Sequence, residues 1–453
     1  MSAFRLYFVT RTKWYISEKT RLLTVYSVAF DIGTNYISGM MMRKIQYRLY
    51  PNSTQTAALE EACELHRQLY NAALEERIAA YRMCGVSVTF VQQDASLTVI
   101  RNEHPAYAAL PRKALVETLR RLDLAFAAFF RRCKAGETPG FPRFKARDRF
   151  KGFGFRTHGD GAAFRPGSER HGRLRIKGIP GSIPARGQPR DMGEIKTLEI
   201  SRRANRWFLT ITVECEPDRV CGDDVIAVDL GVKTLAACVT ASGEPMEAEN
   251  TRIGRKGARR IKALSRKLAR QKRGPARRQR TKIRLARAKA AEANRRKDRA
   301  HQLSAEIVGK AGVIAFEGLN VRNMTRSAKG TVEEEPGTRV RQKAGLNREM
   351  LDTAPAQLMS MLRYKAEDTG AWVMEAPTRK FKPSQTCPSC GRQKAKTLSE
   401  RVHRCECGHV EDRDHAAARV VLNWALSELA REPGQQGEVA VAASANCETA
   451  TLA

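Results

Sequence analysis

Three acidic side chains stand where a predicted strand ends or a predicted helix begins. Asp229 closes the apolar stretch 225–228, and Glu317 closes a second one at 312–316. Asp414 opens a helical segment rich in Ala and Val. A buried strand has little use for a carboxylate at its end unless positive charge lies nearby, and two divalent metal ions that grip a phosphate supply that charge. These three residues are our candidates for a catalytic metal site.

Magnesium is the expected ion, because it prefers oxygen ligands and keeps several waters, so that a few carboxylates suffice. We expect two Mg²⁺ ions about 4 Å apart, with Asp229 bridging both while Glu317 and Asp414 each complete the coordination of one. Asp414 has a second explanation, since a carboxylate in the first turn of a helix is favoured by the helix dipole. Asp412 competes with Asp414 for the metal-binding role.

Four cysteines form two close pairs, Cys387 with Cys390 and Cys405 with Cys407. Four thiolates suit tetrahedral zinc, and a site closed by four protein ligands is structural because no position is left for substrate. The second pair is one residue tighter than usual, which leaves His403 or His409 as a replacement for one cysteine. The other seven cysteines are scattered singly, so an intracellular metal site is favoured over a disulfide framework.

The chain is strongly basic, with 81 Lys and Arg against 48 Asp and Glu, a net charge of +33 and a pI of about 10.2. A polyanion is the expected partner, because each cation set against a phosphate releases condensed counterions. The segment 251–300 alone holds 22 Lys and Arg but only two acidic residues. A solvated basic helix or a disordered tail is the alternative interpretation.

Helical spacing of Ile261, Leu264 and Leu268 argues against disorder in this segment, and Gly274-Pro275 separates it into two helices. We therefore predict an amphipathic helical hairpin whose broad face contacts a nucleic-acid backbone, which gives affinity without sequence choice. The predicted contact residues are Arg266, Lys267, Arg270, Lys272, Arg273, Arg277, Arg278 and Arg280, with Lys145 elsewhere in the chain.

The remaining sequence predicts further elements. A strand at 45–50 stops at Pro51, and Ser53 or Thr54 caps a helix that runs to Arg82. A second helix carries a core stripe of Leu115, Leu119, Leu122, Phe126 and Phe129, and alternating residues predict strands at 195–200 and 207–213. The aromatics between 141 and 155 stack on bases or fill a barrel, two interpretations that stay open. No apolar run reaches 18 residues, so no membrane span is expected.

Several motifs, in their order along the chain, resemble those of the TnpB family. They are Tyr-Arg-Leu-Tyr-Pro at 47–51, Gly-Phe-Pro-Arg-Phe-Lys at 140–145, Asp-Leu-Gly-Val-Lys at 229–233, Phe-Glu-Gly-Leu-Asn at 316–320, the paired cysteines, and Asp-Arg-Asp-x-x-Ala-Ala at 412–418. Members of this family are insertion-sequence-encoded, RuvC-type, RNA-guided nucleases, related to type V CRISPR effectors and long labelled transposases. The resemblance covers about residues 43–425.

The resemblance implies a multidomain α/β protein with a β-barrel and a helical lobe, and an RNase H-like (RuvC) nuclease with an inserted zinc ribbon. The expected divisions are an N-terminal extension at 1–42 (with a true start at one of Met40 to Met42), the first wedge strand at 43–52, a helical recognition lobe at 53–138, the rest of the wedge barrel at 139–222, the nuclease at 223–378, the ribbon at 379–411, the last nuclease helix at 412–427 and a disordered tail at 428–453.

The resemblance also implies the function, the partners and the location. A guide RNA from the transposon end is bound, double-stranded DNA with a short adjacent motif is recognised, and a single RuvC site cuts it, with Asp229, Glu317 and Asp414 at the catalytic positions. The cofactors are Mg²⁺, Zn²⁺ and the guide RNA. A transposase encoded by the same element acts in the pathway, no membrane is involved, and the protein is cytoplasmic, prokaryotic and nucleoid-associated.

Two departures from the family pattern lie beyond the third acid, where Ala416 replaces the usual Asn and Val420-Val421 replace Asn-Ile. They leave open a nuclease-weakened, RNA-guided DNA-binding repressor. A third hypothesis is a transposase or transposase accessory protein that binds DNA directly, although no site for a nucleophilic Tyr or Ser is evident.

Overall fold

The structure is a computed structural model that describes residues 41–167, 171–187, 193–217, 219–328, 331–332, 335–336, 338–377, 381–397 and 400–431. The predictions for residues 1–40 and for the tail beyond Arg431 lie outside the described residues. Met41 and Met42 were assigned to the N-terminal extension, but they belong to the first strand, where they pair with Cys215 and Glu214. That boundary was wrong by two residues.

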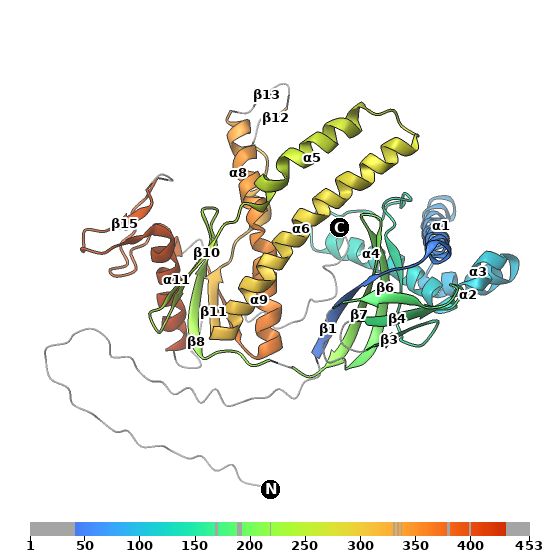
Figure 1. The fold of residues 1–453 in the computed structure, drawn as a ribbon, viewed down its shortest axis with the longest axis horizontal. Helices are drawn as coiled ribbons and strands as arrows, with labels where there is room; N and C mark the ends of the chain where they lie inside the picture. Colours follow the sequence, from blue (N-terminus) through green and yellow to red (C-terminus); the bar gives the residue numbers. More distant parts are fainter. Residues whose placement is uncertain are drawn as a thin grey trace, which may run out of the picture. The chain divides into compact units, whose positions relative to one another are not determined.

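An antiparallel sheet of seven strands takes up the first half of the described chain (Figure 1). Its order is β2-β6-β7-β1-β5-β4-β3. The strands are β1 (Met41–Leu49), β2 (Gly152–Phe155), β3 (Ala162–Pro166), β4 (His171–Ile176), β5 (Ile183–Arg186), β6 (Glu194–Arg203) and β7 (Arg206–Cys215). Burial alternates along β7, because successive side chains of a strand point to opposite faces. The strands predicted at 195–200 and 207–213 are confirmed with longer bounds, and the strand predicted at 45–50 is confirmed as β1, which begins earlier and ends at Leu49.

Four helices interrupt this sheet between its first and second strands in sequence. They are α1 (Ser53–Cys84), α2 (Phe90–Glu103), α3 (Pro105–Ala109) and α4 (Arg112–Lys134). The predicted cap of α1 was wrong, because Asn52 accepts from the Gln55 backbone N–H at 2.8 Å and the Gln55 side chain accepts from the Asn52 backbone N–H in return. In α4, Leu115, Leu119 and Leu122 are buried, while Phe126 and Phe129 are half-buried at the end of the stripe.

The two interpretations of the aromatics between 141 and 155 apply to different residues. Phe153 and Phe155 are buried in the core of the seven-stranded sheet, each with 2% of its surface exposed. Phe141 and Phe144 are 47% and 54% exposed, next to Arg143 and Lys145. Phe153 and Phe155 therefore fill the core of the sheet, Phe150 is half-buried against that core, and Phe141 and Phe144 are the exposed members of the group.

A mixed sheet of five strands forms the second half, with order β10-β9-β8-β11-β14. Its strands are β8 (Asp224–Asp229), β9 (Thr234–Thr240), β10 (Pro245–Glu249), β11 (Ala311–Glu317) and β14 (Trp372–Ala376). The strand β11 runs parallel to both β8 and β14, whereas β8, β9 and β10 pair antiparallel.

Alternating residues of β8 and β11 enter two separate cores, one on each face of this sheet. Ile226 and Phe316 pack into the core that includes residues of α6 (Ala276–Lys310) and α9 (Pro355–Thr369). Ala227 and Ala315 pack into the core that includes α11 (Arg413–Leu429). Helices therefore cover both faces of the sheet (Figure 1).

The predicted basic hairpin consists of α5 (Ile253–Arg270) packed along α6, with Ile261, Leu264 and Leu268 half-buried. Its second helix continues ten residues past the expected end, to Lys310, and leads directly into β11. The smaller elements are α7 (Val321–Met324), β12 (Thr331–Val332), β13 (Glu335–Pro336), α8 (Val340–Thr353), β15 (Val402–Arg404) and β16 (Val410–Asp412). None of the helices in the described part of the chain has the length and apolarity needed to cross a membrane.

Candidate functional site

Asp229 and Glu317 end neighbouring parallel strands of the five-stranded sheet. Val228 of β8 pairs with Phe316 of β11, and each acid is the next residue along its strand. Each acid also lies two residues beyond an alanine that faces α11, so alternation places both carboxylates on the α11 side. Both residues are half-buried. Two acids that are far apart in the sequence therefore lie at the same edge and on the same face of one sheet.

Asp414 joins this edge from the first turn of α11, which packs against β8. A Cβ added to Gly231, two residues after Asp229, would lie 3.9 Å from Asp414 Oδ2. Asp412 has a different task, because its carboxylate accepts a hydrogen bond from the Asp414 backbone N–H at 2.9 Å and caps the helix. Asp412 is therefore the N-cap of α11, and Asp414 lies in the first turn of that helix.

The three acids of this edge carry like charges, which a cation would neutralise. Burial and, to a lesser degree, the neighbouring carboxylates of Asp414 and Glu317 raise the pKa of Asp229 to about 7, while Arg413 opposes them. Among the described residues, the three acids do not form a group whose oxygens all lie within 4.8 Å of one another. An all-carboxylate donor set matches Mg²⁺.

The four predicted cysteines do form such a group, with their sulfur atoms within 4.8 Å of one another. Cys387 Sγ lies 3.7 Å from Cys407 Sγ, and Cys390 Sγ lies 3.5 Å from Cys405 Sγ. These separations match the edges of a tetrahedron with zinc–sulfur bonds of about 2.3 Å. The donor set fits a structural zinc ion.

Neither histidine replaces a cysteine in this group. His403 Nδ1 contacts Lys396 Nζ, and His409 Nδ1 lies 2.9 Å from Ser389 Oγ. One glycine follows each pair of cysteines in the sequence. Gly391 and Gly408 adopt positive φ values of 72° and 89°, which lets each cysteine turn bend back toward the other. Among the described residues, the four cysteines form the group, and both histidines lie outside it.

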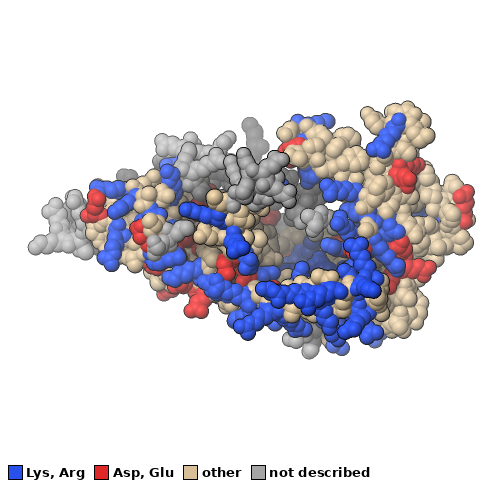
Figure 2. All heavy atoms as spheres, turned by 90° about the horizontal axis from the view of Figure 1, so that it is seen from above, with Lys and Arg blue, Asp and Glu red and all other residues tan. Residues whose placement is uncertain are grey.

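The predicted nucleic-acid contacts gather at the tip of the hairpin, where α5 meets α6. A hollow of about 710 Å³ lies there, lined by Ala263, Arg266, Lys267, Arg270, Gln271, Lys272, Pro275, Arg277 and Arg278. The predicted residues Arg273 and Arg280 are exposed near this tip but do not line the hollow. Figure 2 shows Lys and Arg crowded on the face that carries the hairpin.

Lys145 lies apart from this group, on the loop that follows α4. Its backbone N–H donates to Asn71 Oδ1 at 2.8 Å, and its ammonium lies 5.7 Å from the centre of the Tyr70 ring. The loop is therefore held firmly, with the Lys145 side chain half-buried on an aromatic ring. Lys145 does not line the hollow at the hairpin tip, although Asp148 on the same loop pairs with Lys282 of α6 at 3.2 Å.

Sequence reasoning missed two acids that hold the base of the hairpin. Asp352 of α8 accepts from the Gly254 backbone N–H at 2.8 Å and from Arg296 at 2.9 Å, so it joins α5 to α6. Glu349, one turn earlier, pairs with Arg252 at 2.7 Å and with Arg255 at 2.9 Å. The available signal was two acids three residues apart on a helix that follows an intensely basic segment.

Three family profiles match this chain. The family described as "Probable transposase" (OrfB_IS605) matches residues 208–328, the "Cas12f1-like, TNB domain" matches 356–421, and a "Helix-turn-helix domain" of the same transposase family matches 40–85. In this structure residues 41–85 form the strand β1 and the single long helix α1, rather than two helices joined by a turn.

Two curated proteins are similar to the chain over most of its length. A "Putative RNA-guided DNA endonuclease" of Streptomyces pristinaespiralis is 30% identical over 86% of this chain and 90% of its own. The "Putative RNA-guided DNA endonuclease InsQ" of Escherichia coli (strain K12) is 26% identical over 84% of this chain and 92% of its own.

The fold is similar to that of Cas12f1 in its complex with a single guide RNA and target DNA. The TM-score is 0.54 at 12% sequence identity, and the match covers 85% of this chain and 99% of that one. The chain thus belongs to a class of proteins that share the multidomain fold of type V effectors. In this chain, the fold contains a mixed sheet with acidic residues at one edge. The chain belongs to the TnpB family of transposon-associated proteins, as its motifs indicated.

Proposed function

We propose that this protein is an RNA-guided DNA endonuclease encoded by a transposable element, which cuts target DNA by metal-dependent hydrolysis at one RuvC-type site. The observation that carries this proposal is the convergence of Asp229, Glu317 and Asp414 at one edge of the five-stranded sheet. The names of the two curated relatives support the substrate and the guide.

The topology of the five-stranded sheet supports an RNase H-like nuclease. Three antiparallel strands are followed by two that join in parallel, and helices lie on both faces. Such a sheet delivers acids from β8, β11 and a later helix to a single edge. The hairpin lies between the first two of these acids in the sequence, and the ribbon lies between the second and the third.

The acids of this edge would hold two Mg²⁺ ions, which when bound activate the attacking water and stabilise the leaving 3′ oxygen. The carboxylates of Asp414 and Glu317 both raise the pKa of Asp229, which indicates that Asp229 lies near both of them. Asp229 is therefore the residue suited to contact both ions. Its raised pKa means that a proton competes for the same carboxylate near pH 7. Arg413 favours the ionised form and so helps to keep Asp229 ready to bind.

The other charged elements of the chain fit the proposed partners. The exposed cations at the tip of the hairpin match the phosphates of RNA or DNA, which a nuclease of this kind binds along its length. The four-cysteine group would hold Zn²⁺ as a structural ion. Sequence choice then comes from base pairing between guide and target, as in RNA-guided effectors generally.

The departures from the family pattern do not favour a repressor without nuclease activity. Ala416 is 1% exposed, and Val420 and Val421 are 6% and 2% exposed, so all three lie in the packed interior around α11. These positions belong to the packed side of α11, and none of them is one of the three acids.

The experiment that tests the proposal uses the full chain purified with its co-purifying RNA. The RNA is sequenced, and plasmids that carry either the complementary target or a scrambled one are incubated with the complex in Mg²⁺. We expect cutting of the matched plasmid only. Binding of the matched plasmid without any nick would establish the repressor instead, and strand joining without RNA would establish a transposase.

A further inference from the structure

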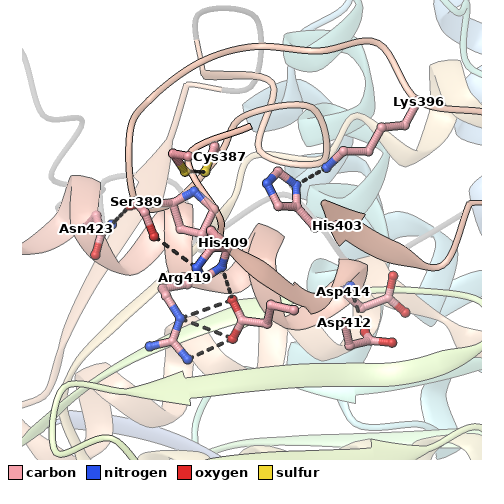
Figure 3. Close-up of polar contacts among 12 residues, drawn as sticks. Cys387, Ser389, Lys396, His403, His409, Asp412, Asp414, Arg419 and Asn423 are labelled. Atoms are coloured by element: carbon pink, nitrogen blue, oxygen red, sulfur yellow. Dashed lines mark hydrogen bonds and ion pairs between the residues drawn. The ribbon is translucent and has the colours of Figure 1, made fainter. Parts of the chain in front are cut away.

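A chain of polar contacts joins the cysteine ribbon to α11 (Figure 3). Ser389 Oγ lies 2.9 Å from His409 Nδ1, and His409 Nε2 lies 3.1 Å from Glu411 Oε2. Arg419 donates to the same Glu411 carboxylate through Nε at 3.1 Å and through its second nitrogen at 2.8 Å. We call this series from Ser389 to Arg419 the strap.

A second contact joins the same two parts. Asn423, one turn beyond Arg419 on α11, donates to the Pro388 carbonyl at 2.8 Å. Pro388 and Ser389 lie between the first two cysteines, and His409 follows the fourth cysteine by two residues. Both cysteine turns are therefore tied to the same helix.

The first residues of α11 lie between Glu411 and Arg419 in the sequence. Glu411 lies on β16, just before the helix, and Arg419 lies in its second turn. The residues between them include the helix cap Asp412 and the proposed metal ligand Asp414. Two parallel hydrogen bonds between a guanidinium and a carboxylate define orientation as well as distance. This pair thus sets the angle at which the chain passes from β16 into the turn that carries Asp414.

We propose that Glu411 and Arg419 are positioning residues for Asp414, and that the metal-loaded ribbon acts on the nuclease site through them. The inference rests on the proposed function, because it assumes that Asp414 binds a divalent ion. When zinc holds the two cysteine turns together, His409 and Pro388 are held in place, and with them the Glu411 carboxylate and the helix. The ribbon is then part of the framework of the catalytic site.

A purely local role, in which the strap only fastens the ribbon, gives different expectations. In that case a break at Arg419 would loosen the cysteine group and lower the zinc content, without an effect of its own on metal binding at Asp414. In our proposal the same break leaves zinc bound and weakens the binding of the catalytic ion. Zinc content and divalent-ion affinity therefore separate the two roles.

The test measures Mn²⁺ binding by electron paramagnetic resonance, since Zn²⁺ is silent in that experiment, together with zinc per chain and RNA affinity. We expect Arg419→Gln to weaken Mn²⁺ binding roughly tenfold, the loss typical of residues that orient metal ligands, while it keeps one zinc per chain and normal RNA binding. Glu411→Gln should give the same loss, and the double variant no more than either single one. Arg419→Lys should recover part of the affinity.

The matched control is Arg431→Gln, because Arg431 pairs with Glu428 at 2.6 Å at the far end of the same helix. It should bind Mn²⁺ like the unmodified protein. Unchanged Mn²⁺ affinity in Arg419→Gln, or loss of zinc in step with Mn²⁺, would overturn the positioning role. If Asp229→Asn leaves the Mn²⁺ binding of the protein unaltered, the proposed nuclease site itself is wrong, and this inference falls with it.

Discussion

At the scale of single residues, the proposed role of Asp229 conflicts with its surroundings. It must be ionised to bind a cation, yet burial and two neighbouring carboxylates raise its pKa to about 7. The ionised form of Asp229 is therefore held at an energetic cost that Arg413 offsets in part and that a bound cation would offset further. The metal-free protein is therefore expected to be less stable when Asp229 is ionised.

The pH dependence of stability tests this point. Because the folded pKa exceeds the unfolded value of 3.8, the folded state binds more protons between these values, and stability falls as pH rises from about 4 to about 7. A tenfold difference between the folded and unfolded proton affinities corresponds to about 1.4 kcal/mol, so Asp229→Asn should stabilise the metal-free protein by about 1 to 3 kcal/mol at pH 8. Urea unfolding at pH 5 and pH 8 measures this difference in the free energy of unfolding.

The control for this prediction is Asp298→Asn, an exposed acid on α6 whose carboxylate accepts from Gln302 at 3.1 Å. It should follow the unmodified protein at both pH values. Parallel stability curves for Asp229→Asn and the unmodified protein would show that the carboxylate carries no such strain.

The three acids could be predicted from the sequence because each closes or opens an element whose apolar pattern is strong. The helix cap Asn52 and the role of Asp412 could not, since a cap depends on backbone angles that differ little between adjacent polar residues. The strap also escaped prediction, because Ser389, His409 and Arg419 have no shared pattern in sequence and meet only when the ribbon folds against α11.

At the scale of elements, α8 holds the hairpin by its base. Asp352, with 8% of its side chain exposed, joins the start of α5 to Arg296 of α6. Glu349 pairs with Arg252, whose φ of 48° lies in the left-handed region at the start of α5. The hairpin is thus anchored at one end and projects its cationic tip.

Removal of the Asp352 charge should loosen that anchor. Because a quarter of the Arg296 side chain is exposed, Asp352→Asn should cost about 1 to 3 kcal/mol, the range for a partly buried polar group that loses its partner. Hydrogen exchange should show faster exchange at residues 254–260 and in the facing part of α6. Exchange rates equal to those of the unmodified protein would mean that α8 is dispensable for the hairpin.

We expect the cysteine ribbon to depend on a bound zinc ion. Cys390→Ser should reduce zinc from one ion per chain to a small fraction, because three thiolates bind far more weakly than four and metal binding supplies folding free energy. Metal analysis measures the zinc, and limited proteolysis should show new cuts between 381 and 412. Full zinc content in this variant would exclude the four-cysteine site. Cys133→Ser, at an exposed cysteine outside the ribbon, is the control.

The elements themselves were largely predictable, since long amphipathic helices and alternating strands carry strong periodic signals. Their ends were less so, and α6 exceeds its expected end because buried Leu303, Ile307 and Val308 continue a helical spacing after the basic segment has ended. The short strands β2 to β5 had no clear signal, because Gly, Pro and Arg interrupt their alternation.

At the scale of the whole molecule, the net charge of +33 dominates binding to any polyanion. Much of it lies on the hairpin, where the cations of the tip line a hollow of about 710 Å³. Binding through such a surface should fall steeply with salt, because each neutralised phosphate releases counterions.

Replacement of Arg266, Arg270 and Arg277 by Gln tests this surface. If all three contact phosphates, the slope of log affinity against log salt should become shallower by about 2 to 3. Filter binding of nucleic acid between about 50 and about 200 mM salt gives the slope. Arg255→Gln is the control within the same helix, because Arg255 already pairs with Glu349 at 2.9 Å and should leave the slope unchanged. An unaltered slope in the triple variant would remove the tip from the binding surface.

The order of strands in the larger sheet was beyond prediction from sequence patterns alone. Strand β1 lies in its middle and pairs along its whole length with β7, which follows about 160 residues later. No local signal in β1 specifies so distant a partner. The resemblance to a known family supplied the idea of an interrupted barrel, and the pairing itself required the structure.

The most direct test of the central claim compares Asp229→Asn, Glu317→Gln and Asp414→Asn with the unmodified protein, each loaded with the same guide RNA and matched target DNA in Mg²⁺. Binding and cleavage are measured in the same samples. We predict that all four complexes bind the target, that only the unmodified protein cuts it efficiently, and that each variant cuts at least about 100-fold more slowly, a loss of about 2.7 kcal/mol or more in barrier lowering. Cutting by Asp229→Asn at the rate of the unmodified protein would contradict the account.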